Sequence, residues 1–404
     1  MSHAVSTGVA VKKQVGARAG LHEKGMSARL LGLFFFLLCG APQAPFAVAE
    51  EVWTGVQRIV AIGDVHGDYQ QFVALLREAG LIDQKNKWTG GKTHLVQTGD
   101  ILDRGPQSRQ VMELLMSLEK EARRAGGRVH ALIGNHEAMN LYGDLRYVSP
   151  QEYEAFRDRN SEKIRDAFYQ QHVEQLKKSS PPGELPELTE SYRQVWESKQ
   201  PLGFFEHRYA LSDRGRYGKW ILGHNAIIKI NDTLFLHGGL SPKYAADSLA
   251  GINERVRDEL EDFTTLAGGI VQDEEGPLWY RGLALAEEES LAAHVRRVLE
   301  NYGARRIVVG HTVTEGAVIP RFGGKVVLID AGLSQFYGAR RACLILEGDR
   351  AYALHRGKKI ALPSDLGAEL LQYLQEAAAL DPSPSSLPGR IRPMEDTSLV
   401  PATR

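Results

Sequence analysis

Cysteine is nearly missing from this chain, because only Cys39 and Cys343 are cysteines among its 404 residues. Cys39 lies in an N-terminal segment that we expect to be removed, so the mature chain would keep one thiol and form no internal disulfide. The same scarcity disfavours metal sites built from several thiolates, such as iron–sulfur clusters. A metal centre in this protein would therefore be made from oxygen and imidazole ligands.

An excess of charge of one sign is also missing. The chain has 49 lysines and arginines against 50 aspartates and glutamates, a net charge of −1. Its basic residues are scattered, which gives no sign of nucleic-acid binding. No internal repeat is present, and a hydrophobic share of 43% allows a large folded core.

No hydrophobic run is long enough to span a bilayer comfortably, which takes roughly 20 apolar residues. The apolar run at 30–39 follows five basic residues and precedes Ala47-Val48-Ala49, a small-residue cleavage pattern. We expect residues 1–49 to be an export signal cleaved near Ala49, giving a periplasmic or secreted protein without stable membrane association. The lack of disulfides favours a bacterial periplasm. The alternative is an N-terminal anchor that stays uncleaved.

The next part of the chain alternates strands and helices, which predicts an α/β fold with parallel strand pairing. Apolar runs predict strands over 58–62, 93–97 and 128–133. Helical spacing predicts helices over 69–79 and 106–124, each followed by glycine. Ligands collect at the carboxyl ends of such strands, so polar residues found there deserve a functional interpretation.

We interpret residues 50–380 as one catalytic domain that contains a mostly helical inserted lid at 144–219. A helix is predicted over 153–176 and a loop over 179–188 within the insert, and residues 381–404 form a Pro- and Ser-rich tail that we expect to be disordered. Another helix is predicted over 285–302. Further strands are expected at 226–230, 233–236, 306–309, 325–329, 342–346 and 351–354.

Five short polar segments follow predicted strands and share glycine with metal-type ligands. They are Gly63-Asp64-Val65-His66-Gly67, Gly99-Asp100-Ile101-Leu102-Asp103-Arg104-Gly105, Gly134-Asn135-His136-Glu137, His237-Gly238-Gly239 and Gly310-His311-Thr312. Any one of them can be an ordinary polar turn. Five in series predict a phosphoesterase centre with two metal ions, in which cations close together activate water and hold a phosphate.

The types of ligand predict two divalent cations that share one carboxylate. Asp64 and His66 can hold the first metal together with Asp100, which would bridge to the second. Mixed oxygen and nitrogen ligands suit Mn, Fe or Zn. The second metal would take Asp100 and the side chains of Asn135, His237 and His311.

His136 adjoins a predicted ligand and is free to protonate a leaving oxygen, with Asp103 as its orienting carboxylate. The alternative makes His136 a third imidazole ligand of the second metal. Arg104 can hold phosphate oxygens in bidentate fashion, although a structural salt bridge would also explain it. Arg281 is a second phosphate-binding candidate, unless it only stacks on the aromatic residues beside it. Asp330 follows a strand and can support a ligand histidine, a role that we leave open.

At these motifs the chain resembles the calcineurin-like metallophosphoesterases of the PPP type, and most closely the bacterial-like branch called Shewanella-like phosphatases. The residues that carry this resemblance include Gly134–Leu141 and Lys229–Pro242, and it extends over about 58–355. It implies a β-sandwich flanked by helices, a dinuclear centre, and the ligand and acid roles given above. A phosphoprotein or phosphopeptide would be the substrate.

The leading hypothesis is a metal-dependent phosphomonoesterase that acts on phosphoproteins through a metal-bridging hydroxide. The second is a hydrolase of dinucleoside polyphosphates or other small molecules that uses the same centre. A phosphate-binding scaffold with an inactive centre would be expected to lack ligands, and none is missing here.

Overall fold

A computed structural model describes residues 50–181, 183–364, 367–382, 385, 387–389 and 391. The predicted export signal at 1–49 and most of the predicted tail at 381–404 lie outside the described residues. Within the described part of the chain, no helix is long and apolar enough to cross a membrane.

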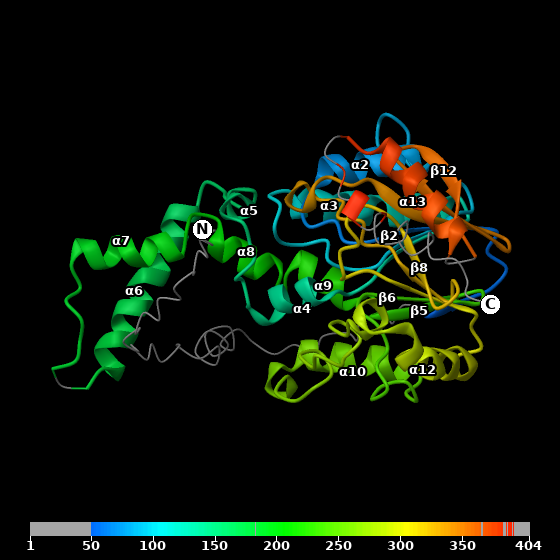
Figure 1. Ribbon diagram of the computed structural model, residues 1–404. Coiled ribbons are helices and arrows are strands. Elements are labelled where there is room, and N and C mark those ends of the chain that lie inside the picture. Colours follow the sequence, from blue (N-terminus) through cyan, green and yellow to red (C-terminus); the bar gives the residue numbers. More distant parts are fainter. Residues whose placement is uncertain are drawn as a thin grey trace, which may run out of the picture. The chain divides into compact units, whose positions relative to one another are not determined.

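The first of two six-stranded sheets contains the three strands that alternate with helices early in the chain (Figure 1). Its order is β12 (Lys358–Ala361), β11 (Arg350–His355), β10 (Ala342–Glu347), β2 (Arg58–Ile62), β3 (His94–Gln97) and β4 (Arg128–Ala131). Strands β2, β3 and β4 pair in parallel, which confirms the predicted pairing. Strands β10, β11 and β12 continue the sheet in antiparallel fashion.

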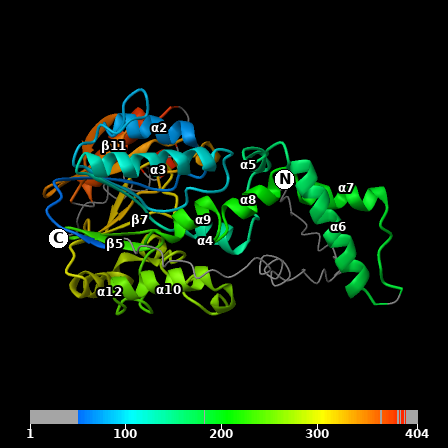
Figure 2. The same ribbon diagram turned by 180° about the vertical axis from the view of Figure 1, so that it is seen from behind.

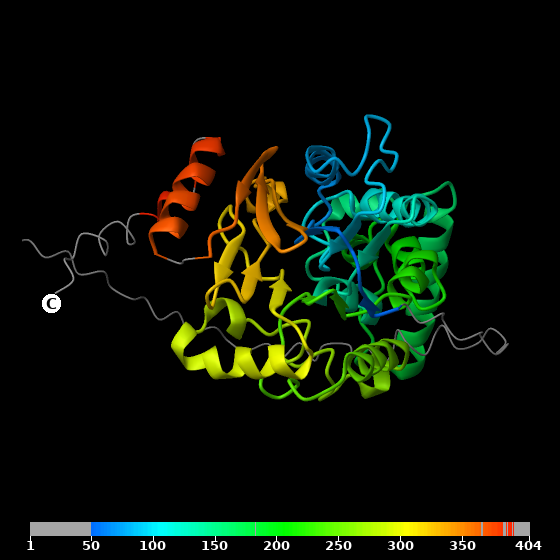
Figure 3. The ribbon, with the colours of Figure 1, turned by 90° about the vertical axis from the view of Figure 1, so that its right-hand side faces the viewer.

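The second sheet has its own parallel group of three strands. Its order is β1 (Val52–Trp53), β5 (Ile227–Ile230), β6 (Thr233–Leu236), β7 (Arg306–Val309), β9 (Val326–Leu328) and β8 (Ile319–Arg321). Strands β6, β7 and β9 are parallel, while β5 and β8 are antiparallel to their neighbours β6 and β9. Figure 3 shows the two sheets packed together, and one hydrophobic core draws residues from both.

Helices cover the outer faces of this sandwich, as Figures 1 and 2 show from opposite sides. Helices α2 (Tyr69–Glu78) and α3 (Ser108–Arg124) lie over the first sheet, and α10 (Leu249–Glu261) and α12 (Glu288–Asn301) lie over the second. The remaining helices are α4 (Asn135–Tyr142), α5 (Pro150–Glu154), α6 (Ser161–Ser179), α7 (Glu190–Lys199), α8 (Phe204–Ala210), α9 (Arg216–Leu222), α11 (Gly282–Leu285), α13 (Ala368–Leu380) and the short 3₁₀ helices η2 (Phe263–Thr265) and η3 (Gln335–Tyr337).

The helical insert differs from the prediction at one point. A continuous helix over 153–176 is wrong, because α5 ends at Glu154 and α6 begins at Ser161. Polar side chains bond to the backbone between them: Asp158 accepts from Asn160 N at 2.6 Å, and Ser161 Oγ accepts from Asp158 N at 2.9 Å. Such local bonds compete with a helix interior and start a new helix instead.

Smaller differences affect other elements. The predicted helix over 285–302 is confirmed as α12, while α4, α10, α11, α13, β1, β8 and β12 had not been predicted. Cys343 is buried in β10, as its apolar neighbours indicate. The predicted tail begins within the folded domain, because Asp381 forms an ion pair with Arg356 at 3.0 Å and Leu387 is fully buried.

Candidate metal centre

The predicted site residues follow strands whose carboxyl ends meet. Asp64 and His66 follow β2, Asp100 follows β3, and Asn135 follows β4 in the first sheet. The second sheet contributes His237 after β6 and His311 after β7. The parallel strands of the two sheets thus bring together all six predicted ligands, from segments up to 247 residues apart along the chain.

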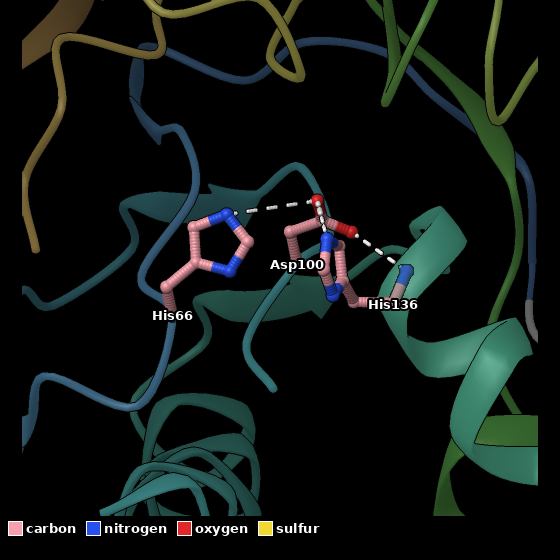
Figure 4. Close-up of side chains that lie close together, drawn as sticks. All are labelled: His66, Asp100 and His136. Carbon is pink, nitrogen blue, oxygen red and sulfur yellow. Dashed lines mark hydrogen bonds and ion pairs between the residues drawn. The ribbon is translucent and has the colours of Figure 1, made fainter. Parts of the chain in front are cut away.

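Asp100 lies at the centre of this cluster (Figure 4). Its Oδ1 accepts a hydrogen bond from His136 N at 3.0 Å. Its Oδ2 lies 3.2 Å from His237 Nε2 and 3.8 Å from His66 Nε2. Burial alone would favour the neutral acid, but the surrounding imidazoles, His237 first, outweigh it and hold the pKa of Asp100 well below its usual range. Asp100 is therefore a buried carboxylate with one oxygen directed at several imidazoles.

Backbone carbonyls fix the tautomers of the three candidate imidazole ligands. His66 Nδ1 donates to Leu102 O at 3.0 Å, and His237 Nδ1 donates to Thr98 O at 2.9 Å. His311 Nε2 donates to Trp279 O at 3.1 Å. A carbonyl can only accept, so each ring keeps its proton on that side and turns a lone pair toward the cluster. Metal-binding histidines commonly hold their other nitrogen in this way.

The ring nitrogens directed at the cluster lie close together. His237 Nε2 lies 3.0 Å from His311 Nδ1 and 2.9 Å from the amide oxygen of Asn135. Burial, first of all, keeps the pKa of His311 well below its usual value, and burial lowers that of His66 to about 4, so both rings are neutral. Three acceptors this close repel one another unless a cation lies between them. The donor set of this centre therefore fits bound cations.

Two groups of ligands share Asp100. His66, Asp100 and His136 form one, and Asp100, His237 and His311 form the other, with the ligand atoms of each group within 4.8 Å of one another. Each group is buried. A carboxylate common to two such groups is the arrangement expected of a site for two cations.

Asp64, which follows β2, also belongs to the centre. It lies beside Asp330, whose role sequence reasoning left open. Asp64 Oδ1 accepts from His311 N at 3.0 Å, and its Oδ2 lies 3.8 Å from His66 Nε2. Burial and the repulsion of Asp330 raise the pKa of Asp64, and burial raises the pKa of Asp330 to about 6. The first sheet and the loop after β9 thus place two buried acids side by side, which bound cations would stabilise as carboxylates.

His136 is held by the carboxylate predicted to orient it. Its Nδ1 lies 2.5 Å from Asp103 Oδ2, and Asp103 Oδ1 accepts from the amide of Asn140 at 2.9 Å. Burial disfavours a charged imidazole, but Asp100 and then Asp103 outweigh it and raise the pKa of His136. Its Nε2 remains 3.8 Å from Asp100 Oδ2, so this geometry is compatible with a proton donor and also with the alternative of a ligand.

Arg104 packs on two aromatic rings. Its guanidinium carbon is 4.0 Å from the ring centre of Tyr147 and 5.0 Å from that of Phe336. Among the residues that the structure describes, no carboxylate pairs with Arg104, so the alternative of a structural salt bridge is wrong. An unpaired cation held by stacking keeps its donors available for an anion.

Arg281 is anchored beside the second group of ligands. Its Nη1 donates to His311 O at 2.7 Å and to Thr312 Oγ1 at 3.1 Å. The side chain is otherwise exposed, and in the described structure no aromatic ring stacks with its guanidinium, contrary to the alternative interpretation. Arg281 therefore presents positive charge at the rim of the centre.

Glu137 was quoted within a motif but received no role from sequence reasoning. Its carboxylate accepts from four backbone groups: Asp100 N at 2.7 Å, Gly134 N at 2.9 Å, Ile101 N at 2.8 Å and Leu102 N at 3.2 Å. Asp100 has a left-handed φ of 57°, a conformation that costs about 1 kcal/mol or more for such a residue. Glu137 therefore holds the loop after β3 in the conformation that places Asp100.

Replacing Glu137 with alanine is expected to lower the free energy of unfolding by about 3 kcal/mol, since it leaves buried N–H groups without acceptors. The measurement is urea-induced unfolding with a chelator present, so that bound cations do not contribute. Glu254→Ala on the exposed face of α10 is the matched control, with an expected effect within about 0.5 kcal/mol. Equal stability of the two variants would contradict this role.

The insert forms hydrogen bonds with the loop before α3, with the start of α3 and with α4. Arg104 N donates to Tyr147 O at 3.0 Å, and the buried Glu152 accepts from Ser108 N at 3.0 Å. Arg208 of α8 donates to the carbonyl of Asn140 near the end of α4. The base of the insert therefore supports the segments that hold Arg104 and His136.

Comparison with known proteins agrees with this geometry. The calcineurin-like phosphoesterase family matches residues 57–315. Shewanella-like protein phosphatase 2 of Arabidopsis thaliana is 32% identical over 313 residues, covering 73% of this chain and 76% of that protein. A solved structure of a cold-active protein-tyrosine phosphatase from a psychrophilic Shewanella species aligns with a TM-score of 0.61 and 29% identity, covering 78% of this chain and 83% of that one. A symmetrical bis(5'-nucleosyl)-tetraphosphatase of Escherichia coli is 40% identical over 76 residues, which cover 19% of this chain and 22% of that protein.

Proposed function

This chain belongs to the calcineurin-like phosphoesterase family, and from that premise we propose that it is a phosphatase of phosphorylated proteins or peptides. The family match and the names of the relatives support phosphatase activity itself. The observation that carries the proposal is Asp100, which belongs both to the group of His66, Asp100 and His136 and to the group of Asp100, His237 and His311.

Two divalent cations fit these residues. We assign the first to Asp64, His66 and Asp100, and the second to Asp100 together with the Asn135, His237 and His311 side chains. When bound, such cations supply Lewis acidity at phosphoryl oxygens and make water nucleophilic near neutral pH. Oxygen and imidazole ligands without thiolates favour Mn, Fe or Zn.

The remaining residues handle the ester and its proton. Arg104 and Arg281 bind the non-bridging phosphate oxygens and so orient phosphorus toward the centre. His136 donates a proton from Nε2 to the departing oxygen, and Asp103 keeps Nδ1 protonated and the ring in place. Because phosphoryl transfer depends mainly on positioning and electrostatics, no protein nucleophile is required.

The choice of substrate rests on similarity in sequence and fold. Relatives that share about three quarters of this chain are named protein phosphatases, and one of them is named a protein-tyrosine phosphatase. A phosphotyrosine peptide is therefore the first substrate to test. The alternative, hydrolysis of dinucleoside polyphosphates, is supported by a match limited to 76 residues, which makes it the weaker hypothesis.

The test uses protein stripped of metal and then loaded separately with Mn²⁺, Fe²⁺ or Zn²⁺. We expect no turnover without metal, and with the best cation a kcat/KM for phosphotyrosine or phosphoserine peptide at least about tenfold above that for a dinucleoside polyphosphate. Released orthophosphate and nucleotide products provide the measurement. Faster cleavage of the dinucleoside polyphosphate would favour the alternative, and inactivity with every cation would contradict a phosphatase.

A further inference from the structure

The carboxylate of Asp68, the residue directly after the first motif, joins two segments far apart in the sequence. Its Oδ1 accepts from Gln71 N at 3.0 Å and so caps the N-terminus of α2. Its Oδ2 accepts from Gln335 N at 2.8 Å, 267 residues later in the chain. Asp68 is 7% exposed, so both bonds lie largely out of water. The second bond is not needed for a helix cap, since an N-cap side chain bonds within its own helix.

The second bond reaches the turn that carries Phe336 and Tyr337. This turn is the helix η3, in which Tyr337 N donates to Ser334 O at 2.9 Å. Phe336 is 59% exposed, which is high for so large an apolar side chain. Tyr337 lies 5.4 Å from His66, ring centre to ring centre. The turn therefore places aromatic rings at the rim of the metal centre.

Phe336 is one of two aromatic rings that pack on Arg104, with its ring centre 5.0 Å from the guanidinium carbon. The other is Tyr147, whose ring centre is 4.0 Å from the guanidinium carbon and whose carbonyl accepts from Arg104 N. In the described structure no carboxylate orients this guanidinium. Stacking on the two rings is therefore the main restraint on its direction.

We infer that Asp68 is a positioning residue for the substrate phosphate: its second hydrogen bond holds Phe336 against Arg104, and through it sets the direction of the guanidinium. This inference rests on the proposed function, since it assigns Arg104 to phosphate binding. Asp68 itself touches neither substrate nor cations in this role. It acts through the turn.

Asp68→Ser separates the two bonds of the carboxylate. Serine caps a helix well but offers one short oxygen, so it keeps the bond to Gln71 N and loses the bond to Gln335 N. We expect KM for an aryl phosphate such as p-nitrophenyl phosphate to rise about tenfold, with kcat within about twofold. The inhibition constant of inorganic phosphate is expected to rise by about the same factor. Phe336→Ala should have both effects, and the double variant should show no more than Phe336→Ala alone.

Inorganic phosphate distinguishes two roles for the ring, because it has no aryl group for Phe336 to touch. An unchanged phosphate inhibition constant would overturn the inference and leave Phe336 as a direct contact of the substrate. Independent effects of the two substitutions would overturn it as well, and so would loss of metal from Asp68→Ser, measured by mass spectrometry.

The control for capping is Ser248→Ala. Ser248 caps α10 by accepting from Gly251 N at 3.0 Å and makes no bond to the η3 turn, so its loss should leave KM and the phosphate inhibition constant unchanged. A comparable rise in Ser248→Ala would show a general effect of destabilisation and overturn the inference. Failure of the proposed function would appear differently, as a wild-type protein that is inactive on every phosphoester with every cation.

Discussion

Replacing Asp100 with asparagine is expected to reduce phosphatase turnover at least about a thousandfold and to reduce the bound metal. Asparagine has nearly the same shape but no charge, and the neutral rings of His66 and His311 beside it cannot supply that charge. Cations in this buried site would therefore lose the carboxylate common to both ligand groups. Initial rates on an aryl phosphate and the metal content per chain, after identical loading, provide the two measurements.

Asp258→Asn serves as the control, since Asp258 is exposed on α10 and the substitution removes the same charge. It should keep both activity and metal. Asp100→Asn with two cations per chain and ordinary rates would contradict the arrangement on which the proposed function depends. Loss of one cation with retention of the other would show that Asp100 serves a single metal.

His136→Asn is expected to keep both cations and to slow the hydrolysis of an alkyl phosphate by about a hundredfold or more. An alkoxide is a poor leaving group and needs the proton that His136 would donate. Nitrophenolate leaves without one, so the loss on p-nitrophenyl phosphate should be much smaller. The ratio of the two losses, measured at saturating substrate, is the decisive quantity.

The same variant tests whether His136 is a metal ligand instead. A ligand role predicts a lower metal content and equal losses on the two substrates. Asp103→Asn provides a second check, because Asp103 lies 2.5 Å from His136 Nδ1 and would act only through that ring. The double variant should then be no slower than His136→Asn alone, since residues that act as a unit are not additive. Independent losses would contradict the pairing.

Sequence reasoning predicted the cluster of ligand-type side chains because its information is local. Each ligand comes directly after a short apolar strand, and parallel strands bring their carboxyl ends to one edge. That rule suffices for Asp64, Asp100 and Asn135, whose strands β2, β3 and β4 are neighbours in one sheet. The same reasoning predicted the strands that precede His237 and His311. That these residues face Asp100 was implied by the family resemblance, since no pattern in a single sequence states which sheets pack together.

What sequence reasoning missed depends on contacts between distant segments. Glu137 has an ordinary place in its motif, and its role appears only when the loop after β3 folds over its carboxylate. The stacking of Tyr147 and Phe336 on Arg104 requires the insert and the η3 turn to meet at one side chain. The helix break before Ser161 was local, and its signal was the polar run at 157–160, which we interpreted as part of one charged helix.

Because the ligands are divided between two sheets, the supply of metal would affect the stability of the folded protein. Asp64, His66, Asp100 and Asn135 come from one sheet, and His237 and His311 from the other, so cations bound among them would cross-link the halves of the sandwich. A ligand that binds only the folded state shifts the folding equilibrium toward it. In a cell short of the cation that binds here, this phosphatase would then be removed by proteolysis as well as inactivated, and its abundance would follow the supply of that cation.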